Sequence, residues 1–170
     1  MKLFMFQVGG NFRNSNVELH DIRFSIGDKV EDCFADLRAQ WWGDKAKFHV
    51  DCWAAIEQAD GHDITLRTTA PEPTPNRLFF INLGGYDPAE FTEQHKNVLI
   101  VAEDANAAKA KALKLVKGWK QPHKDKLFEV DQAVDLSAAL RQYGHFIHLT
   151  KASEMKPFEF TADYILIDKA

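Results

Sequence analysis

The sequence predicts an α+β fold made by tandem duplication of one unit, in which two strands, a helix and two more strands follow one another. Three observations carry this prediction. The apolar segment at residues 2–10 (KLFMFQVGG) returns at residues 77–85 (RLFFINLGG), a Glu-x-His triplet follows each copy, and an apolar stripe with helical spacing follows each triplet. Because a repeated segment marks one structural unit, we expect two equivalent units related by a pseudo-two-fold axis.

The repeat divides the chain into four segments. We assign residues 1–68 to the first repeat unit, residues 69–76 to a proline-rich linker and residues 77–150 to the second repeat unit. Residues 151–170 have no counterpart in the first half, and we interpret them as a C-terminal extension that adds an edge or cross-domain strand. With 170 residues, 45% of them hydrophobic, the chain is long enough for one globule with a substantial core.

Each unit begins with two predicted strands. The apolar runs at residues 2–10 and 77–85 are typical of buried strands that stop at paired glycines, in a turn or a bulge. After a polar loop, the second strands are predicted at residues 22–26 and 98–101.

A helix follows the second strand of each unit. Its apolar residues recur every three to four positions, which places one apolar stripe against a sheet, and an Asp or Asn precedes the stripe as a helix cap. The cap and the stripe are Asp28, Val30, Phe34, Leu37 and Trp41 in the first unit, and Asp104 or Asn106, Ala108, Ala112, Leu115 and Trp119 in the second.

Two further strands complete each unit. They are predicted at residues 47–53 and 62–68 in the first unit and at residues 126–132 and 145–150 in the second, where a short helical stretch at residues 136–143 comes between them. A helix between two strands makes a right-handed parallel crossover, whereas the shorter connections favour antiparallel neighbours. We therefore predict mixed sheets with the helices on one face.

Composition excludes several classes of protein. The net charge of −4 argues against a nucleic-acid partner, which would need a cationic surface, and no apolar segment is long enough to span a membrane. Cys33 and Cys52 lack the spacing of a disulfide framework or a zinc knuckle. We expect a cytoplasmic protein.

The polar motifs of the two units resemble a known family. Residues 18–21 (ELHD) and 48–51 (FHVD) carry the likeness in the first unit, and residues 93–96 (EQHK) and 128–131 (FEVD) carry it in the second. With the paired glycines and the helix ending at a tryptophan, they resemble the bacterial domain of unknown function fifteen forty-three. The resemblance implies two tandem copies and brings no reaction, cofactor or partner.

The two copies differ around these motifs. Lys96 stands where the first copy has Asp21, and Glu129 stands where the first copy has His49. If these positions carry chemistry, the two halves are not equivalent.

The Glu-x-His triplets are the sharpest candidates for a site. Alternate residues of a strand share one face, so Glu18 and His20, like Glu93 and His95, can share a divalent metal or act as an acid–base pair. Zinc generally takes three or four ligands, so a metal site needs both halves or a further residue. The structural alternative is that Glu-x-His fastens the Gly-Gly loop through backbone hydrogen bonds.

A second tier of candidates is Asp51 with His62 and Asp131 with His145. The predicted topology places Asp51 and His62 at the far end of a strand parallel to that of Glu18 and His20, roughly 17 Å away within one half. Only a head-to-tail meeting of the halves would then unite them. The structural alternative is that the two aspartates cap the turns that follow them.

The paired glycines are candidates for anion binding. Gly9, Gly10, Gly84 and Gly85 allow close approach of backbone amides to a ligand. No helix begins directly after them, however, as phosphate sites of the known kinds require. A bulge at the strand end is the structural alternative.

These observations predict a module that binds a small molecule or a protein partner and has no recognisable catalytic set. The protein partner can be a second copy of the chain, in a homodimer. The alternative is a metal-dependent or acid–base enzyme that uses the duplicated Glu-x-His motifs, with a divalent metal as cofactor.

Overall fold

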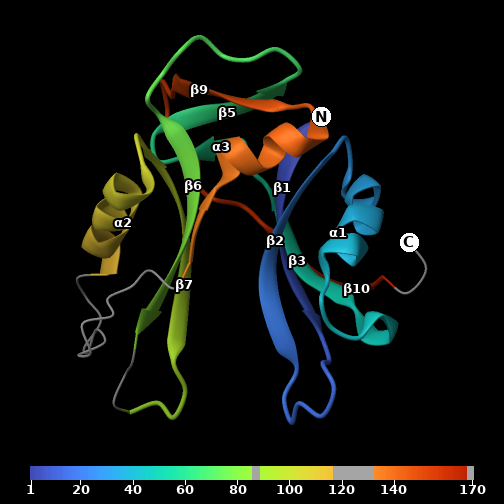
Figure 1. Cartoon of the computed structure of the whole chain (residues 1–170). Coiled ribbons are helices and arrows are strands. Elements are labelled where there is room, and N and C mark those ends of the chain that lie inside the picture. Colours follow the sequence, from blue (N-terminus) through green and yellow to red (C-terminus); the bar gives the residue numbers. More distant parts are fainter. Residues whose placement is uncertain (86–88, 117–131, 168–170) are drawn as a thin grey trace. The chain divides into compact units, whose positions relative to one another are not determined.

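The computed structural model describes residues 1–85, 89–116 and 132–167 of the chain (Figure 1). In this part of the chain, ten strands form three antiparallel sheets and three α-helices accompany them, which confirms the α+β class. The predicted helix end at Trp119 and most of the strand predicted over residues 126–132 lie outside the described residues. Among those described, no helix has the length and apolar character needed to cross a membrane.

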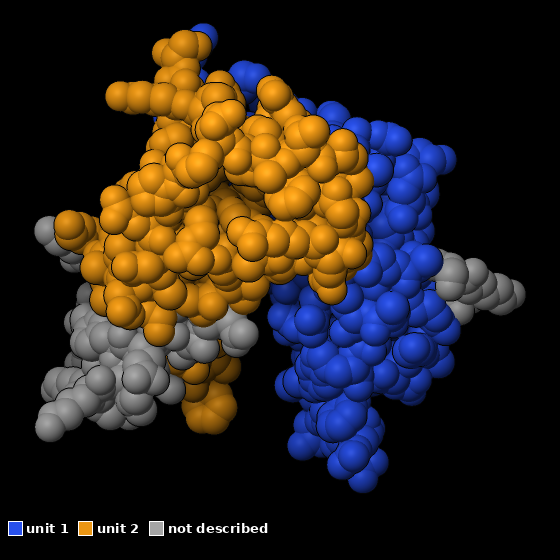
Figure 2. Space-filling model, turned by 45° about the horizontal axis from the view of Figure 1, so that its top comes forward, with its two compact units in different colours: residues 1–58, 154–170 blue, residues 59–153 orange. Residues whose placement is uncertain are grey.

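The chain forms two compact units (Figure 2). The first contains Met1–Gln58 together with Glu154–Ala170, and the second contains Ala59–Ser153. The strand predicted at residues 62–68, which we assigned to the first repeat unit, therefore lies in the second compact unit.

Four strands form the sheet of the first unit, in the spatial order β10-β3-β1-β2 (Figure 1). Neighbouring strands are antiparallel. The C-terminal strand lies at the edge of the sheet, beside β3. The strands are β1 (Lys2–Gly10), β2 (Leu19–Gly27), β3 (His49–Ala55) and β10 (Thr161–Leu166).

A helical segment covers one face of this sheet. The 3-10 turn η1 (Val30–Cys33) continues as helix α1 (Phe34–Gln40), and a second turn, η2 (Lys45–Lys47), precedes β3. The predicted apolar stripe of this segment packs on the sheet, so the helix leaves the opposite face of the sheet uncovered. The buried core consists of Phe4, Phe6, Val8, Cys33, Leu37, Trp41, Phe48, Val50 and Ile167.

Strand β3 is irregular at Asp51. Val50 pairs with Val8 of β1, but Cys52 pairs with the adjacent Gln7, so Asp51 is an extra residue. The pairing of β3 with β10 shifts at the same place. A bulge of this kind re-aims a side chain, and it leaves Asp51 on the face of the sheet that α1 does not cover.

The second unit contains two sheets, with strand orders β7-β6-β8 and β4-β5-β9. Helix α2 packs on β6 and β7 through Ala108 and Ala112, and its cap is Asp104, whose side chain accepts a hydrogen bond from the backbone N–H of Ala107. The strands are β4 (Gln58–Ala59), β5 (His62–Arg67), β6 (Arg77–Gly85), β7 (Gln94–Ala102), β8 (Gln132–Asp135) and β9 (Phe146–Lys151). The helical elements are α2 (Ala105–Leu113), η3 (Lys114–Val116), α3 (Leu136–Ala139) and η4 (Leu140–Tyr143).

The first two strands of each half pair in the same register. Gly9 lies opposite His20 in the β1–β2 pair, and Gly84 lies opposite His95 in the β6–β7 pair. The third strand lies on the other side of the first in both sheets, since the orders β3-β1-β2 and β8-β6-β7 correspond.

The prediction of mixed sheets is wrong. The chain passes from β2 through α1 to β3, and these two strands flank β1 on opposite sides. They run parallel without being neighbours, so the predicted crossover exists but skips a strand. The strands predicted at residues 62–68 and 145–150 pair with each other, as β5 and β9, and not with the strands of their own halves.

Candidate metal centre

Two histidines flank one glycine on the uncovered face of the first sheet. Gly9 of β1 lies opposite His20 of β2 on one side and opposite His49 of β3 on the other. The three residues therefore form a row across three adjacent strands, and the middle member has no side chain.

The missing side chain at Gly9 makes room for the imidazoles. A Cβ built on Gly9 would lie 2.6 Å from Nε2 of His49 and 3.1 Å from Cδ2 of His20. Both rings therefore lean over the glycine. This close approach explains why glycine, and no larger residue, lies between the two histidines.

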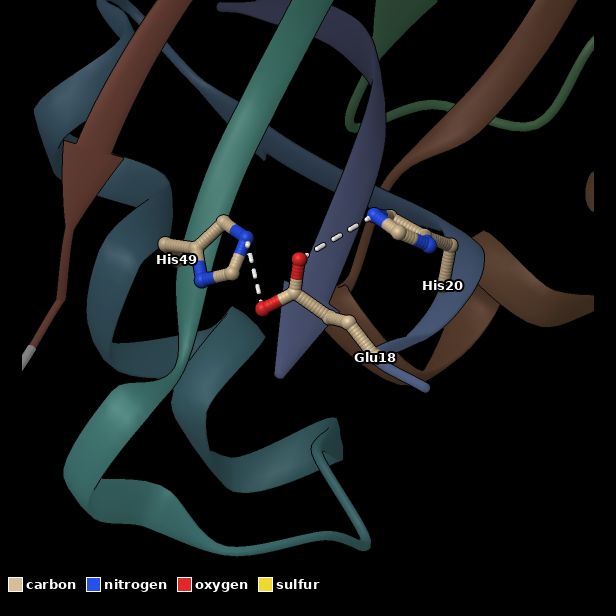
Figure 3. Close-up of side chains that lie close together, drawn as sticks. All are labelled: Glu18, His20 and His49. Carbon is tan, nitrogen blue, oxygen red and sulfur yellow. Dashed lines mark ion pairs between the residues drawn. The ribbon is translucent and has the colours of Figure 1, made fainter. Parts of the chain in front are cut away.

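The carboxylate of Glu18 lies between the two rings (Figure 3). Its Oε2 is 3.6 Å from Nε2 of His20, and its Oε1 is 3.6 Å from Nε2 of His49. Glu18 directly precedes β2, and its side chain is 42% exposed. These three side chains offer one ligand atom each, all within 4.8 Å of one another.

Asp51 approaches the same two nitrogen atoms. Its Oδ2 lies 3.4 Å from Nε2 of His20, and its Oδ1 lies 3.4 Å from Nε2 of His49. We call Glu18, His20, His49 and Asp51 the His49 cluster. Asp51 lies on the histidine face, two residues after His49, at the bulge in β3.

A backbone contact fixes the orientation of His49. Its Nδ1 lies 2.8 Å from the carbonyl oxygen of Lys47, which can only accept, so Nδ1 donates. In the neutral imidazole, Nε2 then carries the free lone pair. A histidine that donates one ring N–H to a carbonyl and presents the other nitrogen is the arrangement typical of metal ligands.

The nitrogen that His49 presents is buried and has no hydrogen-bond partner among the residues that the structure describes. His49 is 1% exposed, and within the same residues its Nε2, like Oδ2 of Asp51, makes no hydrogen bond. N–H···O hydrogen bonds span about 2.7–3.2 Å, so the separations of 3.4 and 3.6 Å are too long for direct bonds. Buried polar atoms are normally paired, which indicates that a further group belongs between them.

The nitrogen–oxygen separations are close to those of a tetrahedral metal site. Metal–ligand bonds of about 2.0–2.1 Å place neighbouring ligand atoms about 3.4 Å apart in a tetrahedron. The four nitrogen–oxygen distances in the His49 cluster are 3.4 or 3.6 Å, and each carboxylate approaches the two nitrogens with different oxygen atoms. Two imidazoles favour zinc and related transition metals over calcium and magnesium, which prefer oxygen ligands.

The charge of the cluster also suits a cation. Glu18 and Asp51 bring two carboxylates to one spot, and no Lys or Arg within residues 1–85, 89–116 and 132–167 forms an ion pair with either. A divalent ion would balance both carboxylates.

In the second half, the triplet has different surroundings. Nε2 of His95 lies 3.7 Å from Oε2 of Glu93, while its Nδ1 lies 3.3 Å from Oδ1 of Asn82. Asn82 in turn donates a hydrogen bond from its Nδ2 to Oδ1 of Asn97 at 2.7 Å. Gly84 and Gly85 lie at the end of β6, beside this triplet.

Of the second-tier residues that the structure describes, only Asp51 lies in the His49 cluster. Asp51 joins Glu18 and His20, contrary to the separation of roughly 17 Å expected from the sequence. His49 and Asp51 lie at the start of β3, and the starts of β2 and β3 meet at the Gly9 end of β1. Asp131 lies outside the described residues.

His62 and His145 belong to the β5–β9 sheet. The Nδ1 atom of each lies 2.9 Å from a backbone carbonyl oxygen two residues earlier, that of Asp60 and that of Tyr143. His62 lies opposite Lys151, while His145 precedes the other end of the ladder. These two histidines fasten the turns before their strands.

The paired glycines of β1 end the strand but do not form the bulge. Both Gly9 and Gly10 pair regularly with β2. A Cβ on Gly10 would lie 3.0 Å from the indole of Trp41, so this glycine admits the tryptophan on the core side of the sheet.

The sequence interpretation missed His49 as a ligand. The signal was present, because residues 49 and 51 alternate along a strand as residues 18 and 20 do, and each pair joins a histidine to a carboxylate. What the spacing could not give was the register that puts both pairs opposite Gly9.

Comparison with known proteins places this cluster in a recognised segment. A family model described as Domain of Unknown Function (DUF1543) matches residues 15–66. This segment contains all four members of the His49 cluster and covers less than half of the chain. The match is to one copy. No curated protein matches the chain.

A solved structure shares the fold over nearly the whole chain. It is described as the crystal structure of a protein Il1583 from Idiomarina loihiensis, with 28% sequence identity and a TM-score of 0.71. The similarity covers 96% of this chain and 94% of that one. Neither description names a ligand or a reaction.

Proposed function

We propose that the first unit binds a divalent transition metal ion, zinc being the best fit, at the His49 cluster. Glu18, His20 and His49 supply the ligands. Asp51 lies against both imidazoles and contributes its charge, which leaves the fourth coordination position open. The observation that carries the proposal is the buried Nε2 of His49, which faces two carboxylates and has no hydrogen-bond partner within the described part of the chain.

The ligand set resembles that of catalytic zinc sites. Two histidines and a glutamate leave a coordination position for water or a small molecule, whereas structural zinc sites are closed by four protein ligands. Two of the three ligands are partly open to solvent, since the side chains of Glu18 and His20 are 42% and 43% exposed. The module therefore binds a small molecule through the metal.

The proposal predicts the metal content of purified protein. We expect one tightly bound equivalent after dialysis against zinc, measured by elemental analysis, and its loss in His20→Ala and His49→Ala. His20→Ala is the more informative variant because His20 is exposed, so its removal leaves the core intact. His62→Ala is the matched control, since it removes a histidine that holds a turn instead.

Two results would overturn the proposal. One is the absence of stoichiometric zinc in the wild-type protein under these conditions. The other is a bound equivalent that survives in both His20→Ala and His49→Ala while each variant keeps the wild-type circular dichroism spectrum.

We also propose that the two halves of the chain descend from one duplicated unit. The common register of the β1–β2 and β6–β7 pairs supports this, together with the repeated glycines and Glu-x-His triplets. Only the first half then keeps the second histidine, because Glu129 stands at the position of His49.

The cytoplasmic location, a protein partner and a homodimer stay predictions. Cys33 and Cys52 are free thiols, in keeping with a reducing compartment. The test of a partner is size-exclusion chromatography with light scattering at several protein concentrations. A constant monomer mass would exclude the homodimer.

A further inference from the structure

The C-terminal strand places two apolar side chains beside the His49 cluster. In β10, Ile165 packs on the core of the α1 face, so Tyr164 and Leu166 alternate onto the opposite face. Leu166 lies directly opposite His49 in the β10–β3 pair. Both side chains are unusually open for apolar groups, with Tyr164 62% and Leu166 48% exposed.

Tyr164 contacts a proposed ligand directly. Its ring centroid lies 4.5 Å from that of His49, with an angle of 33° between the planes. The pairing irregularity between β3 and β10 falls between Ala162 and Ile165, next to Asp51 on the facing strand. The irregularity thus shapes both the polar and the apolar side of the same site.

We propose that the bound metal takes an aromatic ligand with one anionic oxygen-donor group, such as a carboxylate or a hydroxamate, whose ring packs against Tyr164 and Leu166. This inference rests on the metal site proposed above. Small-molecule sites typically combine a few convergent polar groups with an apolar wall. Here the metal is the polar anchor, and strand β10 is the wall.

The charges disfavour a ligand that carries more than one negative charge. A divalent ion balanced by Glu18 and Asp51 leaves no excess positive charge. Phosphate groups are usually held by Arg, Lys or several metal ions, and no Lys or Arg of the described part of the chain forms an ion pair with the cluster carboxylates. A phosphorylated ligand is therefore a poor fit.

The test compares two hydroxamates on zinc-loaded protein by isothermal titration calorimetry. Benzohydroxamate and acetohydroxamate share the metal-binding group and differ in the ring. We expect benzohydroxamate to bind about tenfold more tightly, because its ring contacts the ring of Tyr164 and buries apolar surface there. In Tyr164→Ala the ratio should fall to about threefold or less, while Tyr164→Phe keeps it.

Three controls separate this inference from the metal site. Zinc affinity should be the same in wild-type protein and in Tyr164→Phe, which keeps the ring against His49, and Tyr164→Ala is titrated with hydroxamate at saturating zinc. Phe91→Ala, which removes an exposed aromatic side chain elsewhere, should keep the wild-type ratio. Metal-free protein should bind neither hydroxamate.

The inference is overturned if zinc binds but the hydroxamates bind equally, or if the preference persists in Tyr164→Ala. It is also overturned if metal-free protein binds benzohydroxamate as well as zinc-loaded protein does. Failure of zinc itself to bind would instead overturn the proposed function, so the two failures are distinguishable.

Discussion

Gly9 lies directly beneath the imidazole of His49, where a Cβ would come within 2.6 Å of the Nε2 nitrogen. Separations under about 3 Å do not occur between such atoms, so any side chain at Gly9 must displace the ring. The glycine is therefore the floor of the proposed metal site.

A side chain at Gly9 should weaken zinc binding without removing a ligand. We expect Gly9→Ala to weaken zinc affinity about 10–100-fold, the usual cost of disturbing the support of a metal ligand. Gln7→Ala, which truncates a side chain on the same face of β1, is the control. Competition with a zinc indicator measures both variants. Wild-type affinity in a folded Gly9→Ala protein would show that His49 is not a ligand.

The second Glu-x-His triplet should not be needed for tight zinc binding. All members of the His49 cluster lie in the first unit, whereas His95 lies in the second. We expect His95→Ala to keep one tight equivalent of zinc in elemental analysis. Loss of that equivalent would favour the joint site that the duplicated motifs suggest.

The core behind the first sheet should affect stability but not zinc affinity. Leu37 of α1 is fully buried on the face opposite the His49 cluster. We expect Leu37→Ala to lower the free energy of unfolding by about 2–5 kcal/mol in urea titrations. The exposed Lys45→Ala should change it by less than about 0.5 kcal/mol.

Leu37→Ala also tests whether the core face of the sheet affects zinc binding on the opposite face. Below its unfolding transition, Leu37→Ala should bind zinc with wild-type affinity. A large loss of affinity in the folded variant would mean that the helix positions the ligands.

Cys33 should make stability depend on pH in alkaline solution. Burial, opposed in part by a hydrogen bond with Ser25, raises the pKa of the Cys33 thiol from 9.0 to about 11. Between these values the unfolded chain loses the thiol proton while the folded protein keeps it. Stability therefore falls as pH rises through this window.

Urea titrations from pH 8 to pH 10.5 check this expectation. Other groups titrate over the same range, so the informative quantity is the difference between wild-type protein and Cys33→Ala. The wild-type free energy of unfolding should fall more steeply. Parallel slopes would show that the thiol ionises equally in both states.

Much of the fold follows from local patterns. The strand at residues 2–10 and the cap at Asp104 appear as predicted. The apolar stripe of the first helix packs on its sheet, but the helical segment is capped by Lys29 and not by the predicted Asp28, and it begins as a 3-10 turn. Local patterns do not specify which strands are neighbours. The mixed sheet was expected because the crossover from β2 to β3 was assumed to join adjacent strands, whereas β1 lies between them.

The site was predicted in part for the same reason. Glu18 and His20 share a face by simple alternation, as do His49 and Asp51, but the meeting of the two pairs depends on the pairing register of strands that are distant in sequence. The spacing of residues does not reveal this register. His49 also has no histidine counterpart in the second half, where Glu129 stands at the equivalent position, so the repeat did not point to it.

The most direct test of the metal site is the X-ray absorption spectrum of zinc-loaded protein at the zinc edge. We predict two imidazole ligands with zinc–nitrogen distances of about 2.0–2.1 Å, together with carboxylate oxygen at about 2.0–2.2 Å. A shell of oxygen atoms without imidazole scattering would contradict the assignment of Glu18, His20 and His49 as the ligands.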